Sequence, residues 1–282
     1  MDKSSFSIKN VITTAIPSLL SISENARLEV ELLLSHLLGV TRSHLHAWPD
    51  NTLTVKQFDQ FQAFLQRRCQ GEPTAYLIGY KEFWSLKLRV TPATLIPRPE
   101  TELLVELALK LLPATDFAQL IDLGTGSGAI ALTLAQERPQ WQIIATDCYP
   151  DTLAIAQENA HQLNLTQVHF LLSDWFTELK GIKADLIIAN PPYIAESDPH
   201  LLSLSYEPKM ALVAGTEGLI HLEHFITHAP YYLTEQGWLL LEHGYQQMDA
   251  VQRLFLQQGY TAIKTYQDLA HLPRVTLGQM KL

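Results

Sequence analysis

Cysteine is scarce in this sequence, and long apolar runs are missing from it. The 282 residues include two cysteines, Cys69 and Cys148, so a disulfide framework is excluded as a source of stability and a reducing cytoplasm is the expected location. Residues 1–10 carry no apolar core of a signal peptide, and no later stretch approaches the ~18–20 apolar residues of a membrane span. We therefore expect a cytoplasmic protein without membrane segments.

Charged residues are also few, at 17% of the chain, and acidic ones predominate. The formal net charge is −9 and it divides unevenly, because residues 1–90 carry +2 and residues 91–282 carry −11. Proteins bind a nucleic-acid backbone with lysine and arginine, so an acidic region is poorly suited to that task. The composition argues against a direct nucleic-acid substrate and leaves a cationic small ligand open.

What the sequence does contain is ample material for buried cores. Hydrophobic residues make up 47% of the chain, and its length favours two domains. Apolar residues at helical spacing predict amphipathic helices around 28–37 and over 55–69. A turn at 71–73 precedes alternating apolar residues at 80–96, which predict a hairpin. We predict a helical N-terminal domain over residues 1–75, a linker with a β-hairpin over 76–98, and a larger domain over 99–282.

The larger domain repeats a strand–helix pattern after an expected helix over 101–112. Helices separate most of five predicted strands, at residues 120–123, 143–146, 168–172, 186–189 and 238–242. A last helix and two strand-like runs, at 262–266 and 274–277, complete the chain. Such repeats fold into a parallel sheet that is covered on both faces. The predicted fold class is α/β, a doubly wound Rossmann-like sheet preceded by a small all-helical domain.

A glycine-rich segment lies between the first of these strands and the helix after it. Glycines at this place allow a tight turn and let a ligand lie against bare backbone at a helix N-terminus. The next strand ends in Asp147, at the distance expected for a carboxylate that accepts hydrogen bonds from ribose hydroxyls. We therefore predict a site for an adenosine-like ligand, formed by Asp147 and by Asp122, Gly124, Thr125, Gly126, Ser127 and Gly128.

Two cofactors fit this pattern, because the spacing G-x-G-x-x-A also satisfies the fingerprint of NAD-binding proteins. Two further features favour S-adenosylmethionine. Asp122 lies two residues before the first glycine, inside the strand end, where it can help to hold the cationic methionine part of that cofactor. Asp174 and Trp175 follow the third strand, where adenine can be hydrogen-bonded and packed. The competing interpretations are a glycine turn without a ligand and a tryptophan that belongs to the core.

Asn190-Pro191-Pro192-Tyr193, the NPPY turn, follows the fourth strand at the edge where open parallel sheets bind ligands. Consecutive prolines stiffen the turn and remove two backbone donors, so that carbonyl acceptors remain. Hydrogen bonds to Asn190 and to the Pro191 carbonyl would orient an amide –NH2 group and raise its electron density, while Tyr193 stacks on the amide plane. We predict a methyltransferase acting on a planar nitrogen, with Asn190, Pro191 and Tyr193 as catalytic residues and the whole NPPY turn, Pro192 included, as the substrate site. A structural proline turn is the other interpretation.

These motifs together resemble those of class I methyltransferases that act on exocyclic or amide nitrogen. The sequence around these motifs resembles one family in particular, the peptide chain release factor glutamine methyltransferases (PrmC/HemK). The segments that carry this likeness are residues 73–79, 82–84, 94–102, 206–208, 211–212, 240–244 and 274–278. The likeness covers nearly the full length, and it shows no departure at the motif positions.

The resemblance implies a reaction, a cofactor and a partner. The substrate would be the glutamine of the Gly-Gly-Gln motif in bacterial peptide chain release factors, methylated on its side-chain amide nitrogen with S-adenosylmethionine as donor. The helical N-terminal domain would help to recognise the release factor. Asn190 would contact the cofactor as well as the glutamine.

Other functions stay open at this point. One is a glutamine methyltransferase of a ribosomal protein, and another is an N6-adenine methyltransferase, which meets the same flat –NH2 group but requires a basic groove. A hydride-transferring dehydrogenase leaves the NPPY turn unexplained. A sensor of an adenosyl ligand would bind without turnover.

Three further features have two interpretations each. Residues 221–228 carry three histidines at helical spacing, for which a solvated helix face is favoured over a metal site. Arg98 and Glu100 lie on a proline-bounded loop that either closes over the site or forms a structural salt bridge. Cys148 has no paired histidine or cysteine pattern, so we expect a small core residue.

Overall fold

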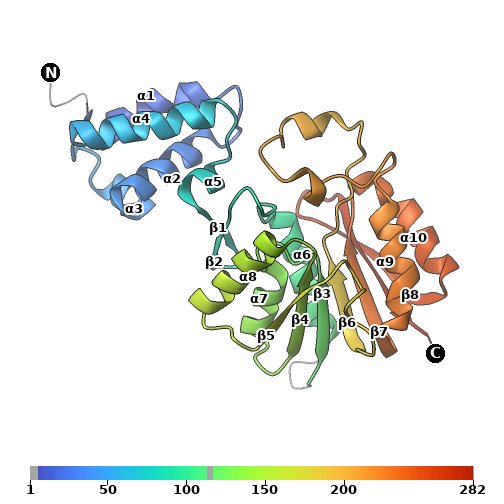
Figure 1. The fold of residues 1–282 in the computed structure, drawn as a ribbon. Helices are drawn as coiled ribbons and strands as arrows, with labels where there is room; N and C mark the ends of the chain where they lie inside the picture. Colours follow the sequence, from blue (N-terminus) through green and yellow to red (C-terminus); the bar gives the residue numbers. More distant parts are fainter. Residues whose placement is uncertain (1–5, 113–116, 282) are drawn as a thin grey trace. The chain divides into compact units, whose positions relative to one another are not determined.

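The computed structural model describes residues 6–112 and 117–281, which form two compact units (Figure 1). The first unit ends at Tyr80 and the second begins at Lys81. Within the described ranges, no helix combines the length and the apolar character that a membrane crossing requires.

The first unit is helical, as predicted. Its helices are α1 (Ile8–Ala15), η2 (Ile16–Leu19), α2 (Ala26–Leu38), α3 (Arg42–Ala47), α4 (Val55–Cys69) and α5 (Thr74–Ile78). Ser7, Thr41 and Thr54 cap α1, α3 and α4, because each hydroxyl accepts a backbone N–H in the first turn of the helix that follows. The helix predicted over residues 55–69 is confirmed, and α5 extends across the limit predicted at residue 75.

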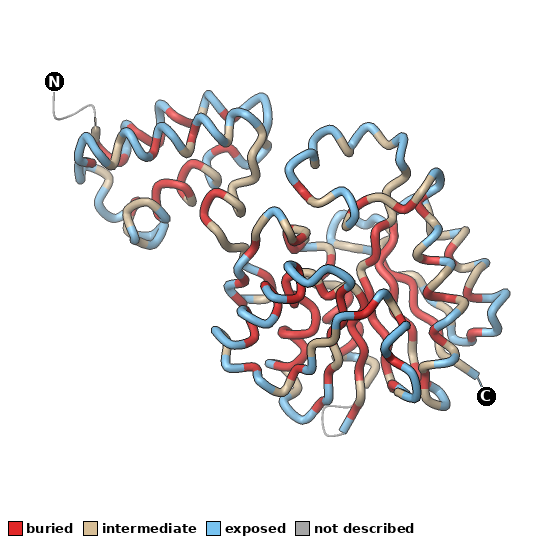
Figure 2. The backbone as a smooth tube through the Cα atoms, in the orientation of Figure 1, coloured by how far each residue is buried: buried red, intermediate tan, exposed pale blue. Residues whose placement is uncertain are grey.

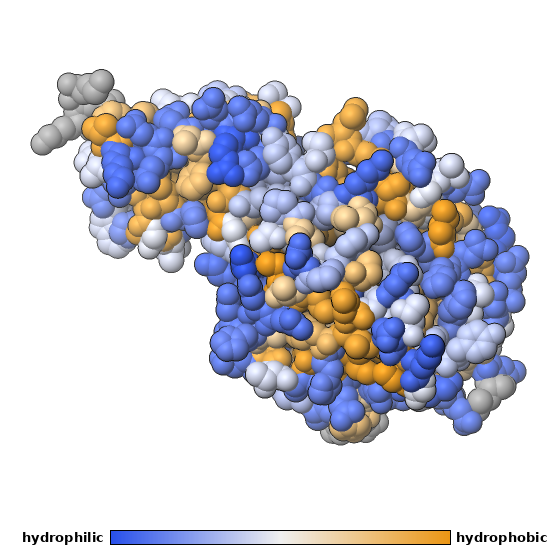
Figure 3. Space-filling model, in the orientation of Figure 1, coloured by the Kyte–Doolittle hydropathy of each residue, from blue (hydrophilic) through white to orange (hydrophobic). Residues whose placement is uncertain are grey.

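An ion pair with a buried carboxylate joins α3 to α2 in this unit. The Glu31 side chain of α2 is 1% exposed, and Arg42 of α3 donates to its carboxylate at 2.7 Å. His46 lies 3.4 Å from the same oxygen. The core beneath consists of apolar side chains from α1, α2 and α4, and the face visible in Figure 3 is mostly hydrophilic, as amphipathic helices require.

A mostly parallel sheet of seven described strands forms the middle of the second unit (Figure 1). The strands are β3 (Gln119–Leu123), β4 (Gln142–Asp147), β5 (Val168–Leu172), β6 (Ala184–Ala189), β7 (Leu233–Glu242), β8 (Tyr260–Gln267) and β9 (Pro273–Met280). Their order is β5-β4-β3-β6-β7-β9-β8, with β9 antiparallel to both of its neighbours. The predicted α/β class is confirmed. The antiparallel edge arises because a short loop joins β8 to β9, which permits a hairpin and no crossover.

Helices cover both faces of this sheet. One layer contains α6 (Glu102–Leu111), α7 (Ala129–Glu137) and α8 (Pro150–Gln162), and the other contains α9 (Ile220–His228) and α10 (Met248–Gln257). Strand side chains alternate between the two cores, so Leu120 faces the first layer and Ile121 the second. Figure 2 shows the strands as the buried interior. Short turns complete the unit: η3 (Pro99–Thr101), η4 (Pro199–Leu202), η5 (Lys209–Ala211), η6 (Ala229–Tyr231) and η7 (Tyr245–Gln247).

The predicted hairpin is present as β1 (Tyr80–Phe83) and β2 (Leu86–Arg89). Both residues of its two-residue turn have positive φ, 49° and 67°, which matches the twist of a tight hairpin. Glu102 of α6 accepts a backbone N–H from this turn at 2.9 Å, and Asn159 of α8 accepts the Arg89 N–H at 2.7 Å. These bonds attach the hairpin to the helices of the second unit.

The carboxyl ends of β3 and β6 define the place where a ligand can bind. From β3 the chain continues outward to β4 and β5, and it then returns to add β6 and β7 on the other side. The loops after β3 and β6 therefore diverge at a topological switch point. Leu123 of β3 pairs with Ala189 of β6, so the glycine loop (residues 124–128) and the NPPY turn start side by side.

Candidate active site

The glycine loop is an open backbone turn between β3 and α7. Gly124, Gly126 and Gly128 all have positive φ, between 60° and 84°, a conformation that glycine adopts without strain. A Cβ at Gly128 would lie 2.8 Å from the Leu132 side chain, whereas one at Gly126 would meet no atom within 4 Å. Gly128 is therefore required for packing, and Gly126 leaves its face open to a ligand.

Asp147 ends β4 beside this loop and is 7% exposed. Its carboxylate accepts the Gly126 N–H at 3.1 Å with one oxygen and the Tyr149 N–H at 3.1 Å with the other. Burial raises the pKa of this carboxyl, and the backbone hydrogen bonds oppose that effect. An ionised carboxylate has about four acceptor positions, so capacity remains to accept from a ribose hydroxyl.

Asp122 lies under the glycine loop and is 1% exposed. The Thr125 hydroxyl donates to one carboxylate oxygen at 2.7 Å, while the other is buried without a partner among the described residues. Burial raises the pKa of Asp122 to about 7, although the Thr125 hydroxyl and the Ala131 backbone N–H oppose the shift. A cationic ligand would pair the orphaned oxygen and favour its ionised form. The acid and the bare loop therefore fit the methionine part of S-adenosylmethionine.

Trp175 lies against the same loop. A Cβ at Gly124 would be 3.2 Å from the edge of the indole ring. From α9, Phe225 packs edge-on against this ring at 4.6 Å between centroids, and His221 lies at 5.2 Å. Trp175 has a φ of 49°, a strained value for a large side chain, which these ring contacts and the turn below maintain.

The turn that carries Trp175 is fastened to β4. The Ser173 N–H donates to the Asp147 carbonyl at 3.0 Å, and the Ser173 hydroxyl donates to the Trp175 carbonyl at 2.9 Å. Asp174 is exposed between them. The structure therefore brings the segment 173–175 next to the glycine loop and Asp147, which is the arrangement that an adenosine site requires.

Asn190 begins the NPPY turn at the end of β6. Its amide nitrogen donates to the Thr101 hydroxyl oxygen at 3.0 Å. This bond directs the NH2 group of Asn190 toward η3, so the side-chain carbonyl oxygen is left as an acceptor on the other side. Pro191 and Pro192 are buried and keep the turn stiff.

Tyr193 is held at both of its ends. Its hydroxyl donates to Glu242 at the end of β7 at 3.1 Å, and its backbone carbonyl accepts the Gln247 side-chain amide at 3.0 Å. Burial, and then the charge of Glu242, raise the pKa of the Tyr193 phenol above its ordinary value, so it stays protonated. The ring borders a cavity of about 260 Å³ whose other lining residues are Leu95, Arg98, Asn190, Pro191, Ile194, Leu204, Ala211 and Leu212.

Two loops are tied together beside this cavity. Glu207 is buried, forms an ion pair with Arg98 and accepts the Ile96 N–H at 3.0 Å. Arg98 thus forms a structural salt bridge, the alternative that the sequence left open, with Glu207 and not Glu100 as its partner. Arg98 also lines the cavity, so the tether fixes one wall of the space next to the NPPY turn.

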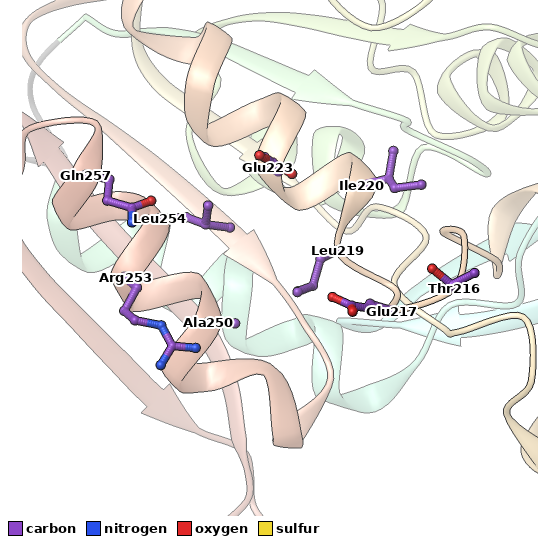
Figure 4. Close-up of a pocket in the computed structure, with 9 residues that line it drawn as sticks. All are labelled: Thr216, Glu217, Leu219, Ile220, Glu223, Ala250, Arg253, Leu254 and Gln257. Carbon is purple, nitrogen blue, oxygen red and sulfur yellow. The ribbon is translucent and has the colours of Figure 1, made fainter.

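A second cavity, of about 310 Å³, lies between α9 and α10 (Figure 4). Side chains from both helices and from the segment before α9 line it, among them Glu217, Glu223 and Arg253. None of the residues predicted for the cofactor or the substrate is part of its lining. Despite its larger volume, it lies outside the predicted site.

The structure corrects the expectation for Cys148 and refines that for the histidines. Cys148 is exposed and not part of the core, because β4 ends at Asp147 and the chain turns toward solvent there. His224 and His228 of α9 stack on each other at 4.2 Å, and His224 is half-buried. In the described part of the chain, no three potential ligands are grouped so that they could hold a metal ion.

Three residues that shape the site, Thr101, Glu207 and Glu242, were not singled out from the sequence. Each lies in a segment that carried the family likeness, but their partners are 49 to 111 positions away in the chain. No local spacing predicts such contacts. For Glu242, the signal was an acidic residue at the carboxyl end of a buried strand, the same signal that identified Asp147.

The fold is similar to solved methyltransferase structures. A methyltransferase from Pyrococcus furiosus matches with a TM-score of 0.55 and 15% identity, over 78% of this chain and 98% of that one. A 16S rRNA N2 G1207 methyltransferase from T. thermophilus matches with a TM-score of 0.54 and 18% identity, over 72% of this chain and 50% of that one. Residues 100–204 also match the family model of the methyltransferase small domain. The chain therefore has a class I methyltransferase fold.

Closer relatives define the family within this class. Proteins named release factor glutamine methyltransferase are 48% identical in Vibrio cholerae, over 92% of this chain and 91% of the relative, and 48% identical in Escherichia coli, over 93% and 95%. The one from Pseudomonas aeruginosa is 46% identical over 95% and 98%. Residues 11–79 match the model of the PrmC N-terminal domain. This chain belongs to the release factor glutamine methyltransferase family, as its sequence motifs predicted.

Proposed function

We propose that this protein methylates the side-chain amide nitrogen of the glutamine in the Gly-Gly-Gln motif of peptide chain release factors, with S-adenosylmethionine as methyl donor. Relatives that bear this name and are 46–48% identical over more than nine tenths of the chain support the substrate. The observation that carries the proposal is the placement of the Asn190 acceptor and the open glycine loop at adjoining strand ends.

The NPPY turn answers the chemical difficulty of this substrate. An amide nitrogen is a poor nucleophile because its lone pair is delocalised into the carbonyl group. Acceptors at the Asn190 side chain and the Pro191 carbonyl bind the two N–H groups, orient the nitrogen and raise its electron density. Tyr193, fixed by Glu242 and Gln247, provides a rigid face beside the amide plane. Catalysis by these groups is mainly positioning and preorganised electrostatics.

The residues on the β3–β4–β5 side hold the cofactor in this proposal. Asp147 accepts the ribose hydroxyls, Asp122 faces the cationic methionine part, and Trp175 with Asp174 contacts the adenine. Bare backbone at Gly126 permits close approach. S-adenosylmethionine supplies an electrophilic methyl group when bound. A nitrogen that gains a methyl group becomes cationic and acidic, so it loses its proton without a strong base.

We further propose that residues 1–75 recognise the release factor, that residues 76–98 connect the domains, and that residues 99–282 carry out methyl transfer. The match of residues 11–79 to a family-specific N-terminal model supports the first assignment. We place the protein in the cytoplasm, where release factors act, and two exposed free cysteines fit that reducing compartment.

A labelling experiment tests the substrate. The protein is incubated with methyl-labelled S-adenosylmethionine and, in separate reactions, a release factor, a ribosomal protein mixture, DNA and RNA. We expect label in the release factor, at glutamine, and we expect its loss when that glutamine is replaced. Label that appears in the ribosomal proteins or the nucleic acids, and not in the release factor, would overturn the assignment.

A further inference from the structure

Glu242 is a buried carboxyl group beside the NPPY turn. It ends β7, is 1% exposed, and accepts the Tyr193 hydroxyl at 3.1 Å. The Thr101 hydroxyl adjoins the same carboxyl group, close enough to lower the pKa of Glu242. Thr101 in turn accepts the Asn190 amide N–H at 3.0 Å. A chain of polar groups therefore runs from Glu242 through Thr101 to Asn190.

The number of available hydrogens fixes the direction of this chain. An ionised carboxylate can only accept, and a hydroxyl has one hydrogen to donate. The Thr101 oxygen already receives an N–H from Asn190. Within the described residues, one oxygen of Glu242 is buried with no hydrogen-bond partner, so the Thr101 hydrogen stabilises the pair most when it points to this carboxylate.

We propose that Glu242 is a positioning residue that, through Thr101, determines which end of the Asn190 amide faces the substrate. The inference rests on the proposed function, in which the Asn190 carbonyl accepts from a substrate –NH2 group. A side chain at position 242 that donates to Thr101 removes the carboxylate as acceptor for the Thr101 hydrogen, and the Asn190 side-chain carbonyl becomes the acceptor for it. Thr101 would then donate to Asn190, and the Asn190 NH2 group would face the substrate NH2 group, where no hydrogen bond forms.

The same role of Glu242 predicts that the reaction slows at acidic pH. Burial raises the pKa of Glu242 to about 7, against the opposing hydrogen bonds from Thr101 and Tyr193. Of the charged groups around it, Arg274 of β9 lowers this pKa and Glu100 of η3 raises it. The carboxyl is ionised above this pH and protonated below it. The turnover number therefore falls as the pH decreases through about 7.

Glu242→Gln is the first test, because it keeps the shape of the side chain and the acceptor for Tyr193 but offers a donor to Thr101. We expect kcat to fall about 100-fold, the scale of one lost preorganised contact. The KM for the release factor and the affinity for S-adenosylmethionine should stay unchanged. The decrease of kcat at acidic pH (the acid limb) should disappear. The matched control is Glu235→Gln, at an exposed position of the same strand, with wild-type behaviour. A wild-type kcat with the acid limb intact in Glu242→Gln would overturn the inference.

Thr101→Val and Thr101→Ser form a second, independent pair, which also decides the matter if Glu242→Gln does not fold. Valine keeps the branched shape without the hydroxyl, and serine keeps the hydroxyl with less bulk. We expect valine to reduce kcat about as much as Glu242→Gln, and serine to keep most of kcat and the acid limb. Equal kcat in the two variants, whether high or low, would overturn the inference because packing alone would then explain the site.

The orientation of Asn190 can also be observed without a substrate. In 15N-labelled protein, the Asn190 side-chain amide signal is assigned by its loss in Asn190→Ala. It should shift with pH around a midpoint of about 7 in the wild type and stay constant in Glu242→Gln. A signal that ignores pH in the wild type would contradict the role of Glu242. Failure of the wild type to label a release factor would instead overturn the proposed function.

Discussion

Asn190→Ala separates the cost to the fold from the cost to the reaction. The variant loses the carbonyl acceptor and the hydrogen bond to Thr101. A hydrogen bond of this kind contributes about 0.5–1.5 kcal/mol to stability, and the buried prolines together with the Gln247 bond to Tyr193 still hold the turn. Loss of one preorganised contact to the reacting group costs about 2.7–4 kcal/mol, which is 10²–10³ in kcat. We therefore expect a folded protein that is almost inactive.

Single-turnover transfer of a labelled methyl group to a release factor measures the reaction, and calorimetry with S-adenosylmethionine measures cofactor binding. Cofactor affinity should be largely kept, because Asp122, Asp147 and the glycine loop lie on other strands. Gln258→Ala, which removes an exposed amide at the end of α10, is the matched control and should behave as wild type. Turnover of Asn190→Ala within a few-fold of wild type would show that Asn190 is not the acceptor for the substrate amide.

Three further predictions concern cofactor binding and stability. Asp147→Ala should weaken S-adenosylmethionine binding more than tenfold by calorimetry, because a hydrogen bond to a charged group contributes about 1.5–3 kcal/mol; unchanged affinity would exclude the ribose role. Gly128→Ala should destabilise the fold by about 1–3 kcal/mol in urea unfolding, since φ is 84° and the new Cβ would lie 2.8 Å from Leu132; equal stability would contradict this geometry. Burial opposes ionisation of Glu31, but Arg42 and His46 outweigh this effect and hold the pKa of Glu31 below its ordinary value. The ion pair therefore stabilises the fold at a pH above the ordinary pKa, and this stabilisation is lost as the pH falls through the lowered pKa. Glu31→Gln should therefore cost about 1.5–3 kcal/mol at neutral pH and little in acid, and an equal cost at both would refute the ion pair.

Strand positions and motif positions could be predicted from the sequence because their signals are local. Apolar runs such as residues 186–189 are buried strands, and the polar segment after each run lies at the carboxyl edge of the sheet. Parallel strands bring these ends together, so the glycine loop, Asp147 and Asn190 were predicted to be neighbours before any contact was known.

Contacts between distant segments could not be predicted in this way. Thr101 and Glu242 reach the NPPY turn across 89 and 49 positions, and Glu207 reaches Ile96 across 111. Their roles depend on how η3, β7 and the loop after β6 pack, which no periodicity records. The exposed Cys148 shows the same limit at short range. The end of β4 at Asp147 was predicted correctly, but the turn of the chain toward solvent directly after it was not.

The switch point divides the site into two halves that carry different chemistry on different strands. β3, β4 and β5 provide the glycine loop, Asp147 and Trp175, whereas β6 and β7 provide the NPPY turn and Glu242. Each half contains a buried carboxyl group with a pKa of about 7, Asp122 in one and Glu242 in the other. Each acid has one buried oxygen without a hydrogen-bond partner among the described residues. That of Asp122 lies under the glycine loop, where a cationic ligand can pair it, whereas Glu242 lies beside the hydroxyls of Tyr193 and Thr101. Ligand binding is therefore expected to change the charge state of the first acid and leave the second in control of the substrate amide. Because β3 and β6 pair directly, the glycine loop of one half and the NPPY turn of the other meet at one edge of the sheet.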